Sequence, residues 1–197
     1  MSQEAKDKIL ANIRRHTRHQ EPHPDLEHFR ATTYEDKIAQ FIKITEAVGG
    51  KVVEVKPEDE LGAIIRNLYP QANRFISDLT LFPLVCTSPR DASSAVEMNG
   101  TDVTITTSPL GVCENACVWV EQTEEWRAQF FIAENLVIIL DRANLVNNMH
   151  EAYQRVKGFH PQTPFSGFIS GPSKTADIEQ SLVMGAHGAR GLTILLR

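Results

Sequence analysis

The stretch GFISGPSKTADIEQSLVMGAHGAR, residues 167–190, contains the transitions that decide the fold. Residues 168–170 have the length and apolar character of a buried strand, and the Gly-Pro pair after them ends it. Ile178, Leu182 and Val183 then recur at helical spacing, and residues 192–196 form another apolar run. This order predicts a strand, a loop, a helix and a parallel strand joined by a right-handed crossover. The loop is expected at the carboxyl edge of the sheet, where open α/β proteins bind ligands.

The loop concentrates side chains that suit an anion. Ser173, Lys174, Thr175 and Asp177 crowd the start of the predicted helix, whose free backbone N–H groups and dipole favour a phosphate or carboxylate. The same residues also suit a simple helix cap at Thr175 or Asp177, and Gln180 would complete an Asp-x-x-Gln capping box with Asp177. The spacing excludes a Walker loop.

The remainder of the chain alternates between helix and strand patterns. Helices are predicted over residues 33–45, 57–68 and 147–156, and strands over residues 52–55, 75–77, 101–105 and 136–140. The last of these strands is a continuous apolar run typical of a buried parallel strand. Residues 29–197 are therefore expected to form one three-layer α/β domain with a mainly parallel sheet. An amphipathic helix and a proline-containing linker predict an N-terminal helical arm over residues 1–28.

Amino-acid composition and net charge limit the classes of function that this chain can have. The chain has 197 residues, 42% of them apolar, and a net charge of −5, which indicates an ordinary globular protein and no nucleic-acid partner. The sequence shows neither a signal-peptide core nor an apolar run that could span a bilayer, so a cytoplasmic location is expected. Four histidines between residues 16 and 28 flank prolines or a helix end, without the fixed spacing of a metal site.

Cysteine usage argues against a cofactor on this chain. Cys86, Cys113 and Cys117 are too few for an iron–sulfur cluster or a structural zinc site, and an odd number does not suit a disulfide framework. The G-x-G-x-x-G fingerprint of dinucleotide-binding proteins does not occur either. We therefore expect buried, reduced cysteines and no metal or organic cofactor.

The run GPSKTADIEQSLVMGAHGAR, residues 171–190, resembles the C-terminal signature of the lactate-utilisation protein C family, also called LUD-domain proteins. Ala189 departs from the family, which usually has proline there. The segment around Glu114 resembles the family's Ala-Glu-Thr-Gly-Thr motif, with Ala116 in place of glycine. The resemblance implies a fold similar to the NagB/RpiA/CoA-transferase group.

The resemblance also implies a function. It predicts an accessory or regulatory subunit of a cytoplasmic L-lactate oxidation system, in which iron–sulfur clusters lie on partner proteins. This chain would then bind a small carboxylate or phosphate. The residues predicted to hold the anion are Gly171, Ser173, Lys174, Thr175, Asp177, His187 and Arg190.

Two alternatives stay open. The segment Cys-Glu-Asn-Ala loosely resembles the Ser-Glu-Asn-Gly segment of class I CoA-transferases, so Glu114 is a candidate catalytic nucleophile of a stand-alone enzyme acting on acyl thioesters or sugar phosphates. Lys174 and the backbone of residues 173–175 would then stabilise developing negative charge. The other alternative is a scaffold protein without a ligand, in which Glu114 has only a structural role.

Overall fold

The computed structural model describes residues 3–17, 22, 30–121, 126–159, 163–175 and 183–197. The chain divides into two compact units, Met1–Ala31 and Thr32–Arg197. The first unit contains helix α1 (Gln3–His16), none of whose residues is buried. The second unit contains all the described strands and the remaining described helices.

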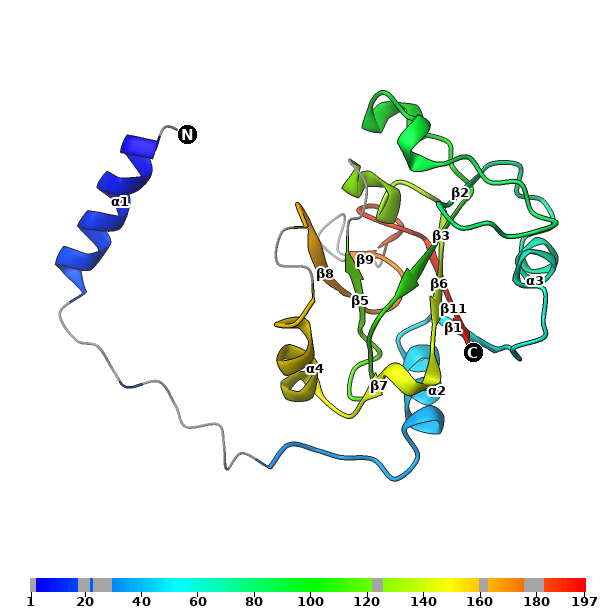
Figure 1. Ribbon diagram of the computed structural model, residues 1–197, viewed down its shortest axis with the longest axis horizontal. Helices are drawn as coiled ribbons and strands as arrows, with labels where there is room; N and C mark the ends of the chain where they lie inside the picture. The colour runs from blue at the N-terminus through cyan, green and yellow to red at the C-terminus, as the bar shows by residue number, and fades with distance from the viewer. Residues whose placement is uncertain (1–2, 18–21, 23–29, 122–125, 160–162, 176–182) are drawn as a thin grey trace. The chain divides into compact units, whose positions relative to one another are not determined.

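A five-stranded parallel sheet forms the centre of the second unit (Figure 1). Its strands run in the order β1 (Lys51–Glu54), β11 (Gly191–Leu196), β6 (Asn135–Leu140), β3 (Val103–Ser108) and β2 (Phe75–Ile76). Every neighbouring pair is parallel. The prediction of a mainly parallel α/β fold is therefore confirmed.

Helices cover both faces of this sheet because its strands are apolar on both sides. Helix α2 (Lys37–Ala47) begins after Asp36, whose side chain accepts a hydrogen bond from the backbone of Ala39, and packs Phe41 against Leu136, Ile138 and Leu140. Helix α3 (Leu61–Leu68) packs Ile65 against Val137 and Ile139 on the opposite face. Alternate residues of β6 thus belong to two separate core clusters, which explains its unbroken run of apolar residues. Helix α3 begins four residues later than the proline predicted to start it.

A second sheet of four short strands packs on the α2 side of the domain. Its order is β7 (Leu145–Val146), β4 (Gly111–Val112), β5 (Val118–Glu121) and β8 (Ser166–Ile169). Leu145 and Val118 join the cluster around Phe41, whereas helix α4 (Met149–Val156) packs Ala152 against Val112 and Val146.

Strand β8 corrects the predicted crossover. It pairs antiparallel with β5 in the second sheet and does not lie beside β11 (Figure 1). Phe168 faces Trp119 across the two strands, with ring centroids 4.8 Å apart in an edge-to-face contact. A short apolar run has the same pattern in either sheet, so the pattern did not distinguish the two, and the aromatic contact across the pair stabilises the pairing with β5.

The helix predicted after Lys174 has its central part, residues 176–182, outside the described residues. On either side of that part the chain is extended: β9 (Lys174–Thr175) pairs antiparallel with β10 (Val183–Met184). Val183 therefore lies in a strand, contrary to the helical spacing assigned to it. The described helices are all too short or too polar to cross a membrane.

Candidate functional site

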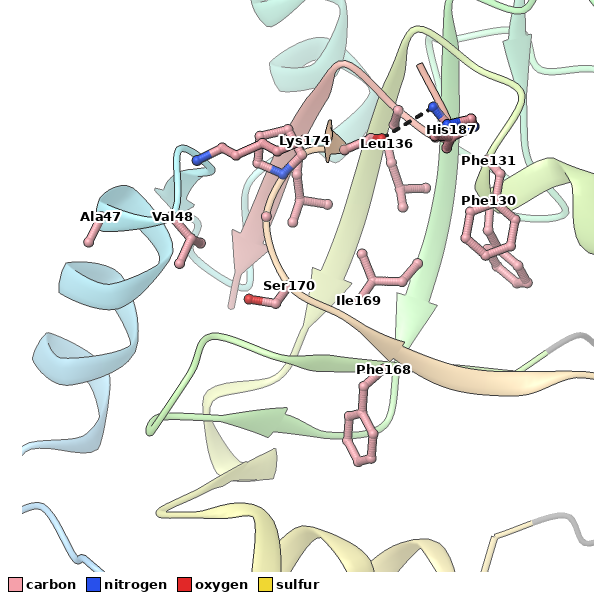
Figure 2. Close-up of a pocket in the computed structure, with 16 residues that line it drawn as sticks. Ala47, Val48, Phe130, Phe131, Leu136, Phe168, Ile169, Ser170, Lys174 and His187 are labelled. Atoms are coloured by element: carbon pink, nitrogen blue, oxygen red, sulfur yellow. Dashed lines mark hydrogen bonds between the residues drawn. The ribbon is translucent and has the colours of Figure 1, made fainter. Parts of the chain in front are cut away.

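A cavity of about 650 Å³ lies where the segment after β8 passes the central sheet (Figure 2). Leu136 and Leu192, the second residues of β6 and β11, form part of its wall. Ala47 and Val48 close it at the end of α2. The polar groups of the lining come from one segment and one turn: Ser170, Ser173, Lys174 and His187.

The position of this cavity corrects a second prediction. Because Leu136 and Leu192 start their strands, the cavity lies at the amino edge of the parallel sheet and not at its carboxyl edge. The expected location assumed that the loop follows a strand of the parallel sheet. Since β8 belongs to the second sheet, the loop after it is free to reach the opposite edge.

Ser173 is fixed by three hydrogen bonds to the turn that follows β10. Its backbone N–H donates to the carbonyl of Ala189 at 2.8 Å, and its carbonyl accepts from Gly185 at 2.9 Å. Its hydroxyl oxygen accepts from the backbone N–H of His187 at 3.4 Å, as Figure 2 shows. A Cβ on Gly188 would lie 3.3 Å from the Cβ of Ser173, so the turn approaches the segment closely. These contacts bring two parts of the predicted site together.

Gly171 shapes the other end of the segment. Its φ of +68° lies in the left-handed region, and a Cβ there would approach the side chain and carbonyl of Val48 to 3.0 Å. The segment therefore passes close to the end of α2 only because this residue is glycine.

Lys174 provides the positive charge of the cavity. Its exposed side chain reaches toward the end of α2 that carries Ala47 and Val48, while Phe130 and Phe131 lie at the opposite end (Figure 2). A Cβ on Gly49 would lie 3.2 Å from the ammonium nitrogen. The ammonium thus stands near the negative end of the α2 dipole, which is a favourable position for a cation.

The predicted ligand residues separate into three groups. Gly171, Ser173, Lys174 and His187 line the cavity. Thr175, in β9, and the exposed Arg190 are not among its lining residues. Asp177 lies outside the described residues, as do His19, His23 and His28 of the N-terminal histidine group.

The sequence prediction missed the aromatic part of the cavity. Phe130 comes from the 3₁₀ helix η3 (Arg127–Phe130), Phe131 follows it, and Phe168 comes from β8. Phe130 is buried, whereas Phe131 is 39% exposed. The sequence pattern around residue 130 resembles that of an ordinary core segment. The only sequence signal for an aromatic cavity wall was the pair of adjacent phenylalanines before a buried strand. The cavity therefore combines an apolar, aromatic end with a basic end.

Glu114 lies in the turn between β4 and β5. Its carboxylate accepts a hydrogen bond from the backbone N–H of Met149 at 3.0 Å. The neighbouring residue, Asn115, accepts a hydrogen bond of 2.7 Å at its carbonyl from the Ser170 hydroxyl. The turn therefore abuts the rim of the cavity, while the Glu114 side chain is directed to helix α4.

The three cysteines are free; Cys113 is buried, as expected, whereas Cys86 and Cys117 are only partly buried. The Cys113 thiol donates to the carbonyl of Lys37 at 3.2 Å, and burial raises its pKa to about 11. Burial likewise raises the pKa of the Cys117 and Cys86 thiols. Within the described part of the chain, no group of three or more His, Cys, Asp or Glu side chains could hold a metal ion.

Comparisons with known proteins place this site in context. Residues 92–196 match the model of the LUD domain. The chain is 30% identical over 100 residues to lactate utilization protein C of Oceanobacillus iheyensis, a match that covers 48% of this chain and 43% of that protein. It is 31% identical over 104 residues to lactate utilization protein C of Shouchella clausii, covering 50% and 45%. The chain thus spans less than half the length of these curated relatives.

A solved structure supports the fold. The crystal structure of a DUF162 family protein from Deinococcus radiodurans superposes with a TM-score of 0.64 at 16% sequence identity. The superposition covers 81% of this chain and 95% of that one. At this identity the likeness concerns the fold alone.

Proposed function

Because this chain belongs to the LUD domain family, we propose that it is an accessory or regulatory subunit of a cytoplasmic L-lactate oxidation system. The relatives that carry the name lactate utilization protein C support this role. Oxidation of lactate to pyruvate removes two electrons and two protons. The proposal assigns the electrons to iron–sulfur clusters on partner proteins, because this chain has only three cysteines, each with a raised thiol pKa.

The contribution of this chain is the binding of an anion in the cavity after β8. The observation that carries this proposal is the convergence of Gly171, Ser173, Lys174 and His187, predicted from sequence, on one cavity. Lys174 supplies the charge, and the hydroxyls of Ser170 and Ser173 supply hydrogen-bonding groups. The Lys174 side chain is exposed and flexible, so its ammonium turns from the α2 end to a bound anion at small cost.

The size and lining of the cavity favour a ligand larger than lactate. A volume of about 650 Å³ is within the range of pockets that bind drug-sized molecules, whereas lactate has only three carbons. Phe130 and Phe131 suit an apolar group at the end away from Lys174. We therefore assign to this cavity an amphipathic carboxylate or phosphate that regulates or assembles the oxidation system, and we assign the oxidation of lactate to the partners.

Purification of the tagged chain from its native cell tests the proposed partnership. We expect co-purifying proteins that contain iron, and lactate-dependent reduction of a redox dye that falls when this chain is removed. Two results together would contradict the proposal. The tagged chain purifies without iron-containing proteins, and cells from which the chain has been deleted oxidise lactate as well as the parent cells do.

Titration with hexanoate and with inorganic phosphate, followed by NMR, tests the anion site separately. Replacing Lys174 with methionine removes a charged hydrogen-bond donor, which is worth about 1.5–3 kcal/mol, so we expect binding at least about tenfold weaker. Lys56→Met is the matched control, because Lys56 is exposed in the turn after β1, and it should leave binding unchanged. Equal affinities of the two variants would show that Lys174 does not bind the anion.

A further inference from the structure

A second cavity, of about 440 Å³, lies at the carboxyl edge of the parallel sheet. Its floor is the end of β3, including Thr106 and Thr107, and Asp78 borders it just beyond β2. Glu121, the last residue of β5, and Gln129 of η3 complete the opposite side. This cavity occupies the edge at which open α/β sheets bind ligands. It shares no lining residue with the cavity after β8.

Gln129 is the feature that points to a ligand. The residue is only 6% exposed and lines the cavity, yet its side-chain amide forms no hydrogen bond with the described part of the chain. Among the described residues, the buried side-chain polar atom without a hydrogen-bond partner is Thr104 Oγ1 and not an atom of the Gln129 amide, so this amide is open to the cavity. It can therefore donate to and accept from a ligand there. Its position is well fixed: the indole N–H of Trp126 donates to the carbonyl of Ala92 at 2.9 Å, and the adjacent Phe130 is buried in the core. These contacts fix η3 on either side of Gln129 at the cavity wall.

The carboxylates around this cavity are held in position. The Ser88 hydroxyl donates to Asp78 at 2.6 Å, and the Arg90 guanidinium lies 3.8 Å from the same carboxylate oxygen. Glu121 accepts a hydrogen bond of 2.9 Å from the indole N–H of Trp119. Each carboxylate keeps further lone pairs for a ligand, because one carboxylate accepts about four hydrogen bonds.

Backbone groups add to this polar surface. Strand β2 pairs with β3 only at Val103 and Thr104. Beyond that point, residues 106–108 have β6 on one side and, in the described part of the chain, no strand on the other. The outer edge of β3 therefore presents N–H and C=O groups beside the cavity.

From these groups we infer that the second cavity binds an uncharged, hydroxyl-rich ligand of the sugar or polyol class. Two carboxylates disfavour an anion, and Arg90 disfavours a cation. A hydroxyl group both donates and accepts, so it satisfies the Gln129 amide, the carboxylates and the strand edge together. Leu79 and Pro109 provide apolar surface for the C–H groups of such a ligand.

Titration of the full chain with D-ribose and with myo-inositol, followed by ¹H–¹⁵N NMR, tests this inference. We expect saturable shifts of the Thr106 and Thr107 backbone amides and of the Gln129 side-chain amide. Inorganic phosphate and putrescine, the anionic and cationic probes, should not produce them. Absence of saturable shifts with both polyols, or shifts produced only by a charged probe, would overturn the inference.

Two variants separate a ligand role from a structural one. Gln129→Met preserves side-chain length and removes the amide, so we expect polyol binding at least tenfold weaker while thermal stability stays close to that of the parent. Gln71→Met, at an exposed position, and Lys174→Met, in the first cavity, serve as controls and should bind as the parent does. If Gln129→Met is poorly folded, Glu121→Gln takes its place, with an expected weakening of severalfold. If the folded variant, Gln129→Met or its replacement Glu121→Gln, binds the polyols with the affinity of the parent, the inference is overturned.

Discussion

The Glu114 carboxylate Oε2 lies 3.0 Å from the backbone nitrogen of Met149 and accepts its hydrogen bond. Met149 is the first residue of α4, which is also capped by Asn148 through a hydrogen bond from Glu151 N–H. A free N–H group at a helix start is stabilised by such a carboxylate. The glutamate kept from the family motif thus links the β4–β5 turn to helix α4.

We expect Glu114→Ala to lower the free energy of unfolding by about 1 kcal/mol, the usual contribution of a helix-capping hydrogen bond. Glu114→Gln keeps an acceptor oxygen and should lose less. Urea denaturation of both variants measures the difference, with Glu58→Ala as a control at an exposed turn position. If Glu114→Ala has the stability of the parent, the hydrogen bond contributes nothing to folding, and a different role for the carboxylate becomes the better explanation.

Ala116 offers a second prediction, because it has a φ of +55° and is 1% exposed. Replacing it with glycine relieves about 1 kcal/mol of left-handed strain but removes one buried methyl group, worth about 0.8 kcal/mol. The two effects nearly cancel, so Ala116→Gly should fall within about 1 kcal/mol of the parent. Ala116→Val should lose about 2 kcal/mol or more, because a β-branched residue is strained at this φ. Thermal unfolding that ranks valine equal to alanine would contradict this geometry.

Gly62 gives a prediction in which packing opposes helix propensity. Alanine is favoured over glycine by about 1 kcal/mol inside a helix, and Gly62 lies in α3. A Cβ at this position would lie 2.1 Å from the carbonyl oxygen of Leu81 and 2.6 Å from that of Phe82. We therefore expect Gly62→Ala to lose about 2 kcal/mol or more in chemical denaturation.

Gly158→Ala is the matched control for that experiment. Its new Cβ would meet the carbonyl oxygen of Arg155 at 3.5 Å, an ordinary contact distance. Its stability should stay within about 1 kcal/mol of the parent. Similar losses in the two variants would indicate that α3 does not approach the loop after β2 as closely as described.

Cys113 predicts how stability depends on alkaline pH. Burial raises the pKa of its thiol from 9.0 to about 11, so the folded protein keeps a proton that the unfolded chain releases. The stabilisation is fully present below pH 9 and is lost as pH rises to about 11, with a magnitude on the order of 2 kcal/mol. Guanidinium denaturation at several pH values between 8 and 11 measures this loss.

The control for the pH experiment is Cys113→Ala. This variant should be less stable at neutral pH because of the cavity it creates, but its stability should fall less between pH 9 and 11. A residual decrease is expected from Cys86, Cys117 and Tyr69, whose pKa values are also raised by burial. An equal decrease in parent and variant would show that Cys113 does not hold its proton as described.

Much of the parallel sheet could be predicted because its strands depend on local patterns. The apolar run at β6 is buried on both faces, so its character does not depend on which neighbours it has. The end of α2 was equally predictable: Gly49, with a φ of +89°, follows it, and β1 begins two residues later. In both cases the signal and the structure that it specifies lie within a few residues of each other.

The partner of β8 could not be predicted in this way. Ser166–Ile169 pairs with β5, about 48 residues earlier in the chain, and the Phe168–Trp119 contact that accompanies this pairing is long-range. Because of this pairing, the candidate anion site lies at the amino edge of the parallel sheet and not at the predicted carboxyl edge. It also brought phenylalanines from η3 and β8 to a cavity whose polar residues had been predicted.

The amino-acid sequence by itself determined the family signature, the α/β class and the residues Gly171, Ser173, Lys174 and His187 that line one cavity. Tertiary structure alone decided where that cavity lies and that Glu114 is directed to helix α4. It also decided that Gln129 lines a second cavity at the other edge of the sheet. The physical reason is that side-chain type and short-range periodicity are local properties. The lining of a cavity and the pairing of distant strands depend on how segments far apart in the chain meet.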